Sequence, residues 1–209
     1  MQVQNIGKWL PAVAPKLIVG LAAIALVSAA SATVASAYNN STNSCGKWPY
    51  AGGYAQLTLY YADAAGANAP TGDYAAALAA ARTSWFNTAT PAVFAYSSPS
   101  TSTHGVYALG PSILGTTMEV CSGGTILQEV VKLNSDTLDS GFYGTVFWKQ
   151  SASAHEQGHH IGLGHSDVLP AIMKTAAGTD ESYNGPLSDD ECGVNHIYAS
   201  ATWPPTCGY

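Results

Sequence analysis

Residues 153–167 read SAHEQGHHIGLGHSD, and the rest of the chain is interpreted from this stretch. In a helix, His155 and His159 lie four residues apart on one face, where two imidazoles can bind one metal ion. Glu156 follows the first histidine and is placed to hold a metal-bound water rather than the metal itself. The spacing therefore predicts a helix that carries two metal ligands and a general base.

The next residues predict a third ligand. Gly162 can take the positive φ of an abrupt helix end. After that turn, His165 can return to the metal. Three histidines leave one position for water, which is the catalytic rather than the structural arrangement of zinc. The alternative is that these histidines lie on a polar helix face or are satisfied within a core.

The full pattern, His-Glu-x-x-His-x-x-Gly-x-x-His, resembles that of the metzincin zinc endopeptidases. Metzincins carry a methionine turn beneath the metal, for which Met173 is the candidate. Ser166, directly after the third histidine, resembles the matrixin branch (the matrix metalloproteinase type). Residues 187–198 are similar to the matrixin C-terminal helix, with its paired aspartates and a tyrosine near its end. The resemblance is specific over about residues 151–198.

The resemblance implies both a fold and a reaction. The implied fold is α+β, with a twisted mixed sheet of four to five strands, about three helices and an active-site cleft. The implied function is zinc-dependent endopeptidase activity, with one catalytic Zn²⁺ bound by the three histidines and Glu156 as general base. Gly162 and Met173 would support the site. One alternative is a secreted zinc-binding protein that works by binding a partner, against which retention of Glu156 argues. Another is a zinc amidase that acts on cell-wall peptide.

The N-terminus has the organisation of a secretory signal peptide. Lys8 and Lys16 precede an apolar run over residues 17–27, and small residues follow up to an Ala-Ser-Ala cleavage site at 35–37. We therefore expect a signal peptide over 1–37 and a single catalytic domain over 38–209, located outside the cell. An uncleaved anchor is the alternative. The alanine-rich, lysine-poor style suggests a bacterial source.

Charge and size restrict the partners. The expected mature chain keeps five basic and all thirteen acidic residues, a net charge of −8 with neutral histidines. It has no basic patch for nucleic acid or for an anionic membrane surface. We expect a protein or peptide substrate and a monomer, with no membrane contact after signal cleavage.

The four cysteines form an even set in a chain expected to be secreted, which predicts two disulfides. Their spacing lacks a Cys-x-x-Cys zinc signature. Of the three possible pairings we expect Cys192–Cys207, which joins the last helix to the tail, and consequently Cys45–Cys121. A matrixin prodomain, whose cysteine caps the zinc, does not fit into the short segment before the first strand.

Hydrophobic patterns give an approximate element order. We expect strands at 56–61, 93–96, 117–121 and 126–133, a helix from about Asp73 as N-cap to Asn87, and the catalytic helix at about 149–163. The first helix should bury Leu78, Ala81, Trp85 and Phe86.

Two further metal sites can be considered from the sequence. Matrixins commonly hold a second, structural zinc in the middle segment, but only His104 is available there, so we expect that zinc to be absent. His160 points about 100° away from its neighbouring ligand and should not reach the metal. Asp136 and Asp139 could ligate calcium, although a polar turn is the simpler interpretation.

Overall fold

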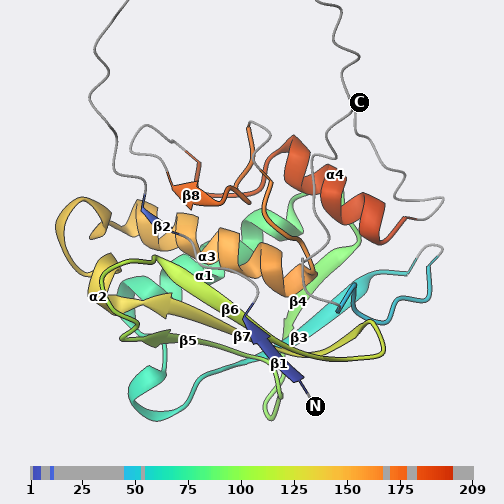
Figure 1. Ribbon diagram of the computed structural model, residues 1–209, viewed down its shortest axis with the longest axis horizontal. Helices are drawn as coiled ribbons and strands as arrows, with labels where there is room; N and C mark the ends of the chain where they lie inside the picture. The colour runs from blue at the N-terminus through green and yellow to red at the C-terminus, as the bar shows by residue number, and fades with distance from the viewer. Residues whose placement is uncertain are drawn as a thin grey trace, which may run out of the picture.

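The structure is a computed structural model that describes residues 2–5, 10–11, 45–52, 55–166, 170–177 and 183–199. It is an α+β fold, as the sequence predicts, in which helices lie against one face of a mixed sheet (Figure 1). None of the helices within these residues is long and apolar enough to span a membrane.

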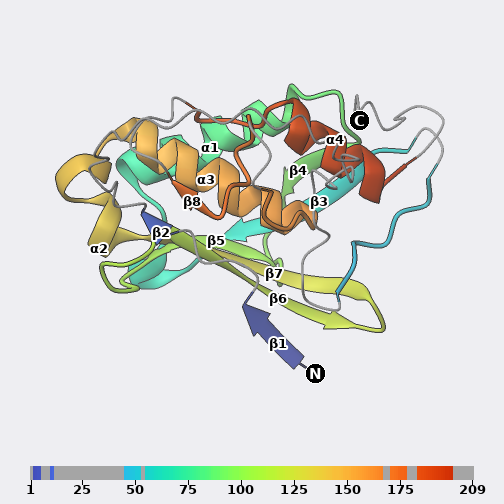
Figure 2. The same ribbon diagram turned by 45° about the horizontal axis from the view of Figure 1, so that its top comes forward.

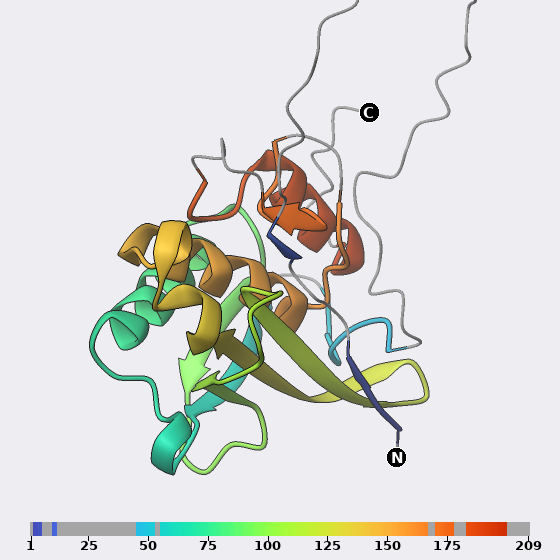
Figure 3. The ribbon, with the colours of Figure 1, turned by 60° about the vertical axis from the view of Figure 1, so that its left-hand side comes forward.

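The sheet has the strand order β1-β6-β7-β5-β3-β4. Its main strands are β3 (Leu57–Asp63), β4 (Ala92–Tyr96), β5 (Thr103–Tyr107), β6 (Gly115–Ser122) and β7 (Thr125–Asn134). The β3–β4, β3–β5 and β5–β7 pairs are parallel, whereas β6 and β7 form an antiparallel hairpin (Figure 3). Without β1, the sheet has the five strands at the upper end of the expected range.

Three short strands lie outside this core. They are β1 (Gln2–Asn5), β2 (Leu10–Pro11) and β8 (Ala176–Ala177). β1 pairs antiparallel with the outer edge of β6, and β2 pairs parallel with β8. Both β1 and β2 belong to the segment expected to be a signal peptide.

Three helices of eight or more residues are described: α1 (Gly72–Phe86), α3 (Val146–Ile161) and α4 (Ser188–Ile197). Shorter helical segments are α2 (Ser135–Leu138), η1 (Gly66–Asn68) and η2 (Gly141–Tyr143). α1 and α3 lie side by side on the same face of the sheet, and α4 crosses near the C-terminal end of α3 (Figures 1 and 2).

Side-chain hydrogen bonds join the two long helices. Trp85 of α1 donates its indole N–H to the carbonyl of Ala154 at 2.9 Å, and Gln157 of α3 donates to the carbonyl of Leu78 at 3.1 Å. Trp85 and Leu78 are completely buried, and burying a leucine side chain contributes roughly 1.5–3 kcal/mol. The first helix therefore fixes the position of the catalytic helix.

The structure corrects three sequence-based expectations. α1 begins at Gly72 with Thr71 at the N-cap, so Asp73 lies in the first turn instead. Phe86 is 63% exposed rather than part of the core, because it ends the helix. α3 occupies Val146–Ile161 rather than 149–163, since Thr145 accepts a capping hydrogen bond from the Trp148 N–H.

The fourth correction is β5, which the sequence does not suggest. Its polar residues and Gly105 weaken the strand pattern. The glycine is required by packing, because a Cβ atom there would lie 2.6 Å from Cβ of Ala64 and 2.9 Å from the carbonyl oxygen of Asn68. β5 places His104 inside the molecule.

The predicted Cys45–Cys121 disulfide is confirmed, and it joins residues 76 positions apart in the sequence. It ties the segment before β3 to β6. Cys192 is also disulfide-bonded, whereas its expected partner Cys207 lies outside the described residues.

Candidate metal centre

The catalytic helix α3 ends at Ile161, directly before Gly162, the glycine that the sequence assigns to an abrupt helix end. Gly162 has φ 113°, in the left-handed region, and its N–H bonds to the carbonyl of His159 at 2.8 Å. A side chain at this position would be strained by its φ and would contact the Tyr198 hydroxyl at 3.3 Å. The chain therefore turns back directly after the second predicted ligand.

This turn brings the three predicted ligands together. His155, His159 and His165 each offer a ligand atom, and these atoms lie within 4.8 Å of one another. Among the described residues, they are the one group of three or more His, Cys, Asp or Glu side chains so arranged. Their spacing fits a single ion.

Hydrogen bonds orient two of these rings. His155 Nδ1–H donates to the carbonyl of Ile172 at 2.8 Å, and His159 Nδ1–H donates to the carbonyl of Leu163 at 2.7 Å. Each Nε2 then carries the lone pair that a metal needs. Nε2 of His159 is buried and makes no hydrogen bond with the described residues. Two imidazoles so held, together with the neighbouring His165, match the three-histidine donor set of catalytic zinc.

The environment keeps His155 and His159 neutral. Burial, followed by the charge of His165, lowers the pKa of His159 to about 3, against a small opposing effect of the Leu163 carbonyl. Burial also lowers the pKa of His155 well below its usual range, with His159 and His165 adding to the effect. His155 and His159 are therefore in their metal-binding form at neutral pH.

The side chain of Glu156 extends from α3 towards the first residues of β6. Thr117 donates its hydroxyl to Oε2 of Glu156 at 2.7 Å. A Cβ atom on Gly115 would lie 2.8 Å from Cγ of Glu156, so only glycine leaves room for this carboxylate. Burial raises the pKa of Glu156 to about 8 in the absence of a cation, with the Thr117 hydroxyl opposing the shift. Neither Gly115 nor the role of Thr117 could be identified from local spacing.

Met173 occupies the position expected of the methionine turn. It is 1% exposed, and a Cβ atom added to Gly158 of α3 would overlap its sulfur.

Asp190 of α4 holds the methionine turn through backbone hydrogen bonds. Its carboxylate accepts the N–H groups of Ile172 at 2.8 Å, Met173 at 3.1 Å and Leu187 at 2.8 Å. Asp190 therefore acts on the predicted ligand His155 indirectly. It holds the N–H of Ile172, and the carbonyl of Ile172 orients the His155 ring. Burial raises the pKa of Asp190 to about 7, and the three N–H donors oppose this shift.

The end of α3 is fixed by two aromatic residues. Tyr198, just after α4, donates its hydroxyl to the carbonyl of Ile161 at 2.6 Å and accepts the Trp48 N–H at 3.1 Å. Trp48 donates its indole N–H to the carbonyl of His160 at 2.7 Å. Segments from both ends of the domain thus hold the turn that carries the ligands.

His104 and His160 bond to each other rather than to the metal group. Arg82 donates to His104 Nδ1 at 3.4 Å, so His104 Nε2–H donates to His160 Nδ1 at 2.9 Å. Burial lowers the pKa of His160 to about 3, and burial together with His160 and Arg82 lowers the pKa of His104 well below its usual range. Both histidines are therefore neutral in the folded protein at neutral pH.

This pair makes stability depend on pH. Between pH 6.5 and the depressed pKa of His104, the unfolded chain binds a proton that the folded chain does not, so acid favours unfolding by up to ~1.4 kcal/mol per pH unit. The stability difference between the wild type and His104→Gln should therefore shrink as pH falls from 7 to 4.5 in urea denaturation. A constant difference for His104→Gln over this pH range would contradict the assignment.

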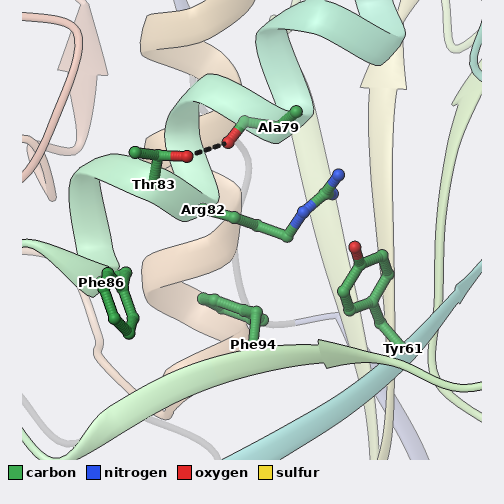
Figure 4. Close-up of a pocket in the computed structure, with 6 residues that line it drawn as sticks. All are labelled: Tyr61, Ala79, Arg82, Thr83, Phe86 and Phe94. Carbon is green, nitrogen blue, oxygen red and sulfur yellow. Dashed lines mark hydrogen bonds between the residues drawn. The ribbon is translucent and has the colours of Figure 1, made fainter.

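A separate hollow of about 350 Å³ lies between α1 and strands β3 and β4 (Figure 4). Its lining residues are Tyr61, Ala79, Arg82, Thr83, Phe86 and Phe94. The Arg82 guanidinium lies 4.4 Å from the Tyr61 ring centre. None of the three clustered histidines lines this hollow, so it is distinct from the candidate metal centre.

The candidate calcium ligands have partners within the protein. Asp136 accepts the Gly110 N–H at 2.7 Å, and Asp139 forms an ion pair with Lys149 at 3.3 Å and accepts the Tyr74 hydroxyl at 2.9 Å. These contacts favour the interpretation as a polar turn.

The comparisons with known proteins agree with this geometry. Residues 142–199 match the family model described as Matrixin. The match contains the three clustered histidines, the methionine turn and α4, which are the parts brought together in space. No curated protein matches the chain significantly. The family match over residues 142–199, the histidine group and the mixed α+β sheet together support a zinc metalloendopeptidase with a matrixin-like catalytic domain.

Proposed function

We propose that the mature chain is a secreted endopeptidase that binds one zinc ion through His155, His159 and His165 and uses Glu156 as general base. The observation that carries this proposal is the close grouping of the three histidines next to a buried glutamate at the edge of the sheet. Bound zinc would polarise the scissile carbonyl and acidify the attacking water.

The protein's own part in the reaction is proton transfer and positioning. Oε2 of Glu156 is held by Thr117, whereas Oε1 makes no hydrogen bond with the described residues. We assign Oε1 to take the proton of the attacking water and pass it to the leaving nitrogen. A neighbouring divalent cation favours the carboxylate form of Glu156, which offsets its burial.

Backbone pairing around the site supports a peptide substrate. β1 runs antiparallel to β6, from Gln2 opposite Cys121 to Asn5 opposite Met118, and so advances along the edge towards Thr117. β2 pairs parallel with β8, which follows the methionine turn. An extended chain can thus pair with β6, which carries Thr117, and with β8, which follows the methionine turn, as a polypeptide substrate would.

Two supporting arguments concern the location. The leader sequence over 1–37 and the Cys45–Cys121 disulfide both fit an oxidising extracellular compartment. We propose a secreted monomer, and the bacterial source stays a prediction.

The competing function within the same chemistry is an amidase for cell-wall peptide. We expect the purified mature chain to cleave casein and unstructured peptides at internal bonds, and a zinc chelator to abolish this cleavage. The same preparation is incubated with cell-wall material, and released amino groups are measured. Release from the cell wall together with inert casein would favour the amidase.

A partner-binding protein without activity is the remaining alternative. It would leave both substrates intact even with a stoichiometric zinc content, which the same assays would reveal.

A further inference from the structure

Two glutamates face each other inside the protein, outside the histidine group. Glu119 of β6 and Glu129 of β7 are directly opposite in the antiparallel register, and neither is accessible to solvent. None of their four carboxylate oxygens makes a hydrogen bond with the described residues. Buried polar atoms are almost always paired, so four such atoms at one place require an explanation.

The described residues supply no compensating charge. The ion pair found within them is Lys149–Asp139, which involves neither glutamate. Burial raises the pKa of Glu119 to about 7, and burial together with Glu119 and Glu156 raises the pKa of Glu129 well above its usual range. Two carboxylates so placed disfavour each other's charge, and a cation between them would reverse this.

The geometry defines the kind of cation. Residues opposite each other in an antiparallel pair have Cβ atoms about 4.5–5.5 Å apart on one face of the sheet, so both carboxylates can reach one ion. The Thr117 hydroxyl lies two residues before Glu119 on the same face and is also buried. The donor atoms are all oxygen, and the set is incomplete without water. Calcium accepts six to eight oxygen ligands in flexible geometry, whereas zinc prefers nitrogen and sulfur.

We propose that Glu119 and Glu129 bind one calcium ion between the β6–β7 hairpin and α3. This site differs from the polar turn of Asp136 and Asp139, whose carboxylates already have partners. It does not depend on the proposed catalytic reaction, because its ligands are not those of the zinc.

The test uses the zinc-loaded mature chain after calcium has been removed. Calcium chloride is added stepwise, and the melting temperature is followed. We expect one calcium per chain and a melting temperature that rises with calcium, since a ligand that binds only the folded state stabilises it. Terbium gives a second measurement on the wild type: luminescence excited through tryptophan should appear with the ion and be displaced by calcium.

Variants separate this site from other acidic residues. Glu119→Gln/Glu129→Gln should weaken calcium binding at least tenfold and remove the thermal shift, whereas the control Asp136→Asn/Asp139→Asn should keep both. Loss of the shift in the control alone would place the ion at the polar turn and overturn the proposal.

A second result would also overturn it. If calcium and terbium have no effect on the wild type and the double glutamine variant melts higher than the wild type, the pair holds protons rather than a cation. The terbium titration on the wild type decides the question even if the double variant does not fold.

Discussion

Glu156→Gln is expected to lower the turnover number for peptide hydrolysis by about 10²–10⁴-fold while leaving the fold and the zinc content unchanged. Glutamine keeps the shape of the side chain and can still accept the Thr117 hydroxyl through its carbonyl oxygen. It cannot take up a proton at neutral pH. The measurement is steady-state hydrolysis of an internally quenched peptide together with metal analysis of the same sample.

The control for this substitution is Glu191→Gln on α4, which carries the same change in charge far from the histidine group in the sequence. It should retain wild-type turnover. If Glu156→Gln stayed within about threefold of the wild type with intact zinc, the role of general base would belong to another group.

The second large effect concerns Asp190. Asp190→Ala leaves the N–H groups of Ile172, Met173 and Leu187 without their acceptor. Each buried unpaired donor costs about 1–3 kcal/mol, and those of Ile172 and Met173 are fully buried, so the free energy of unfolding should fall by roughly 2–6 kcal/mol. For a domain of this size this corresponds to a melting temperature lower by roughly 10 °C. Zinc affinity should fall as well, because the same turn presents the carbonyl that orients His155.

Two variants make the Asp190 result interpretable. Asp190→Asn keeps one acceptor oxygen and should lose less stability than Asp190→Ala. Glu191→Ala changes the neighbouring acid, whose side chain lies at the partly exposed surface of α4, and should shift the melting temperature by at most 2 °C. Equal losses for Asp190→Ala and Glu191→Ala would mean that the three hydrogen bonds contribute little.

The parts of the site that the sequence predicts are those set by local spacing. His155, Glu156 and His159 occupy one helix, and Gly162 and His165 follow within six residues, so helix geometry and one glycine turn fix their relation. The four-residue period and the left-handed turn need no information from the rest of the chain.

The missed features depend on contacts between distant segments. Gly115 and Thr117 shape the space around Glu156 only because β6 lies beside α3. The hydrogen bond from Thr117 to Glu156 joins residues 39 positions apart in the sequence. Likewise, the β6–β7 register alone places Glu119 opposite Glu129. β5 was not predicted because its glycine, which weakens a strand in isolation, is selected by close packing against Ala64.

The central claim is that one zinc, held by the three histidines, makes this chain a peptidase. The most direct measurement is cleavage of an unbiased peptide library by the mature protein before chelation, after removal of the metal, and after zinc is restored, with the metal content determined at each stage. The account predicts one zinc per chain, internal cleavage that disappears with the metal, and recovery on adding one equivalent of zinc. His165→Ala should bind zinc far more weakly and remain inactive. Cleavage that persists in the metal-free protein, or full-affinity zinc binding by His165→Ala, would contradict it.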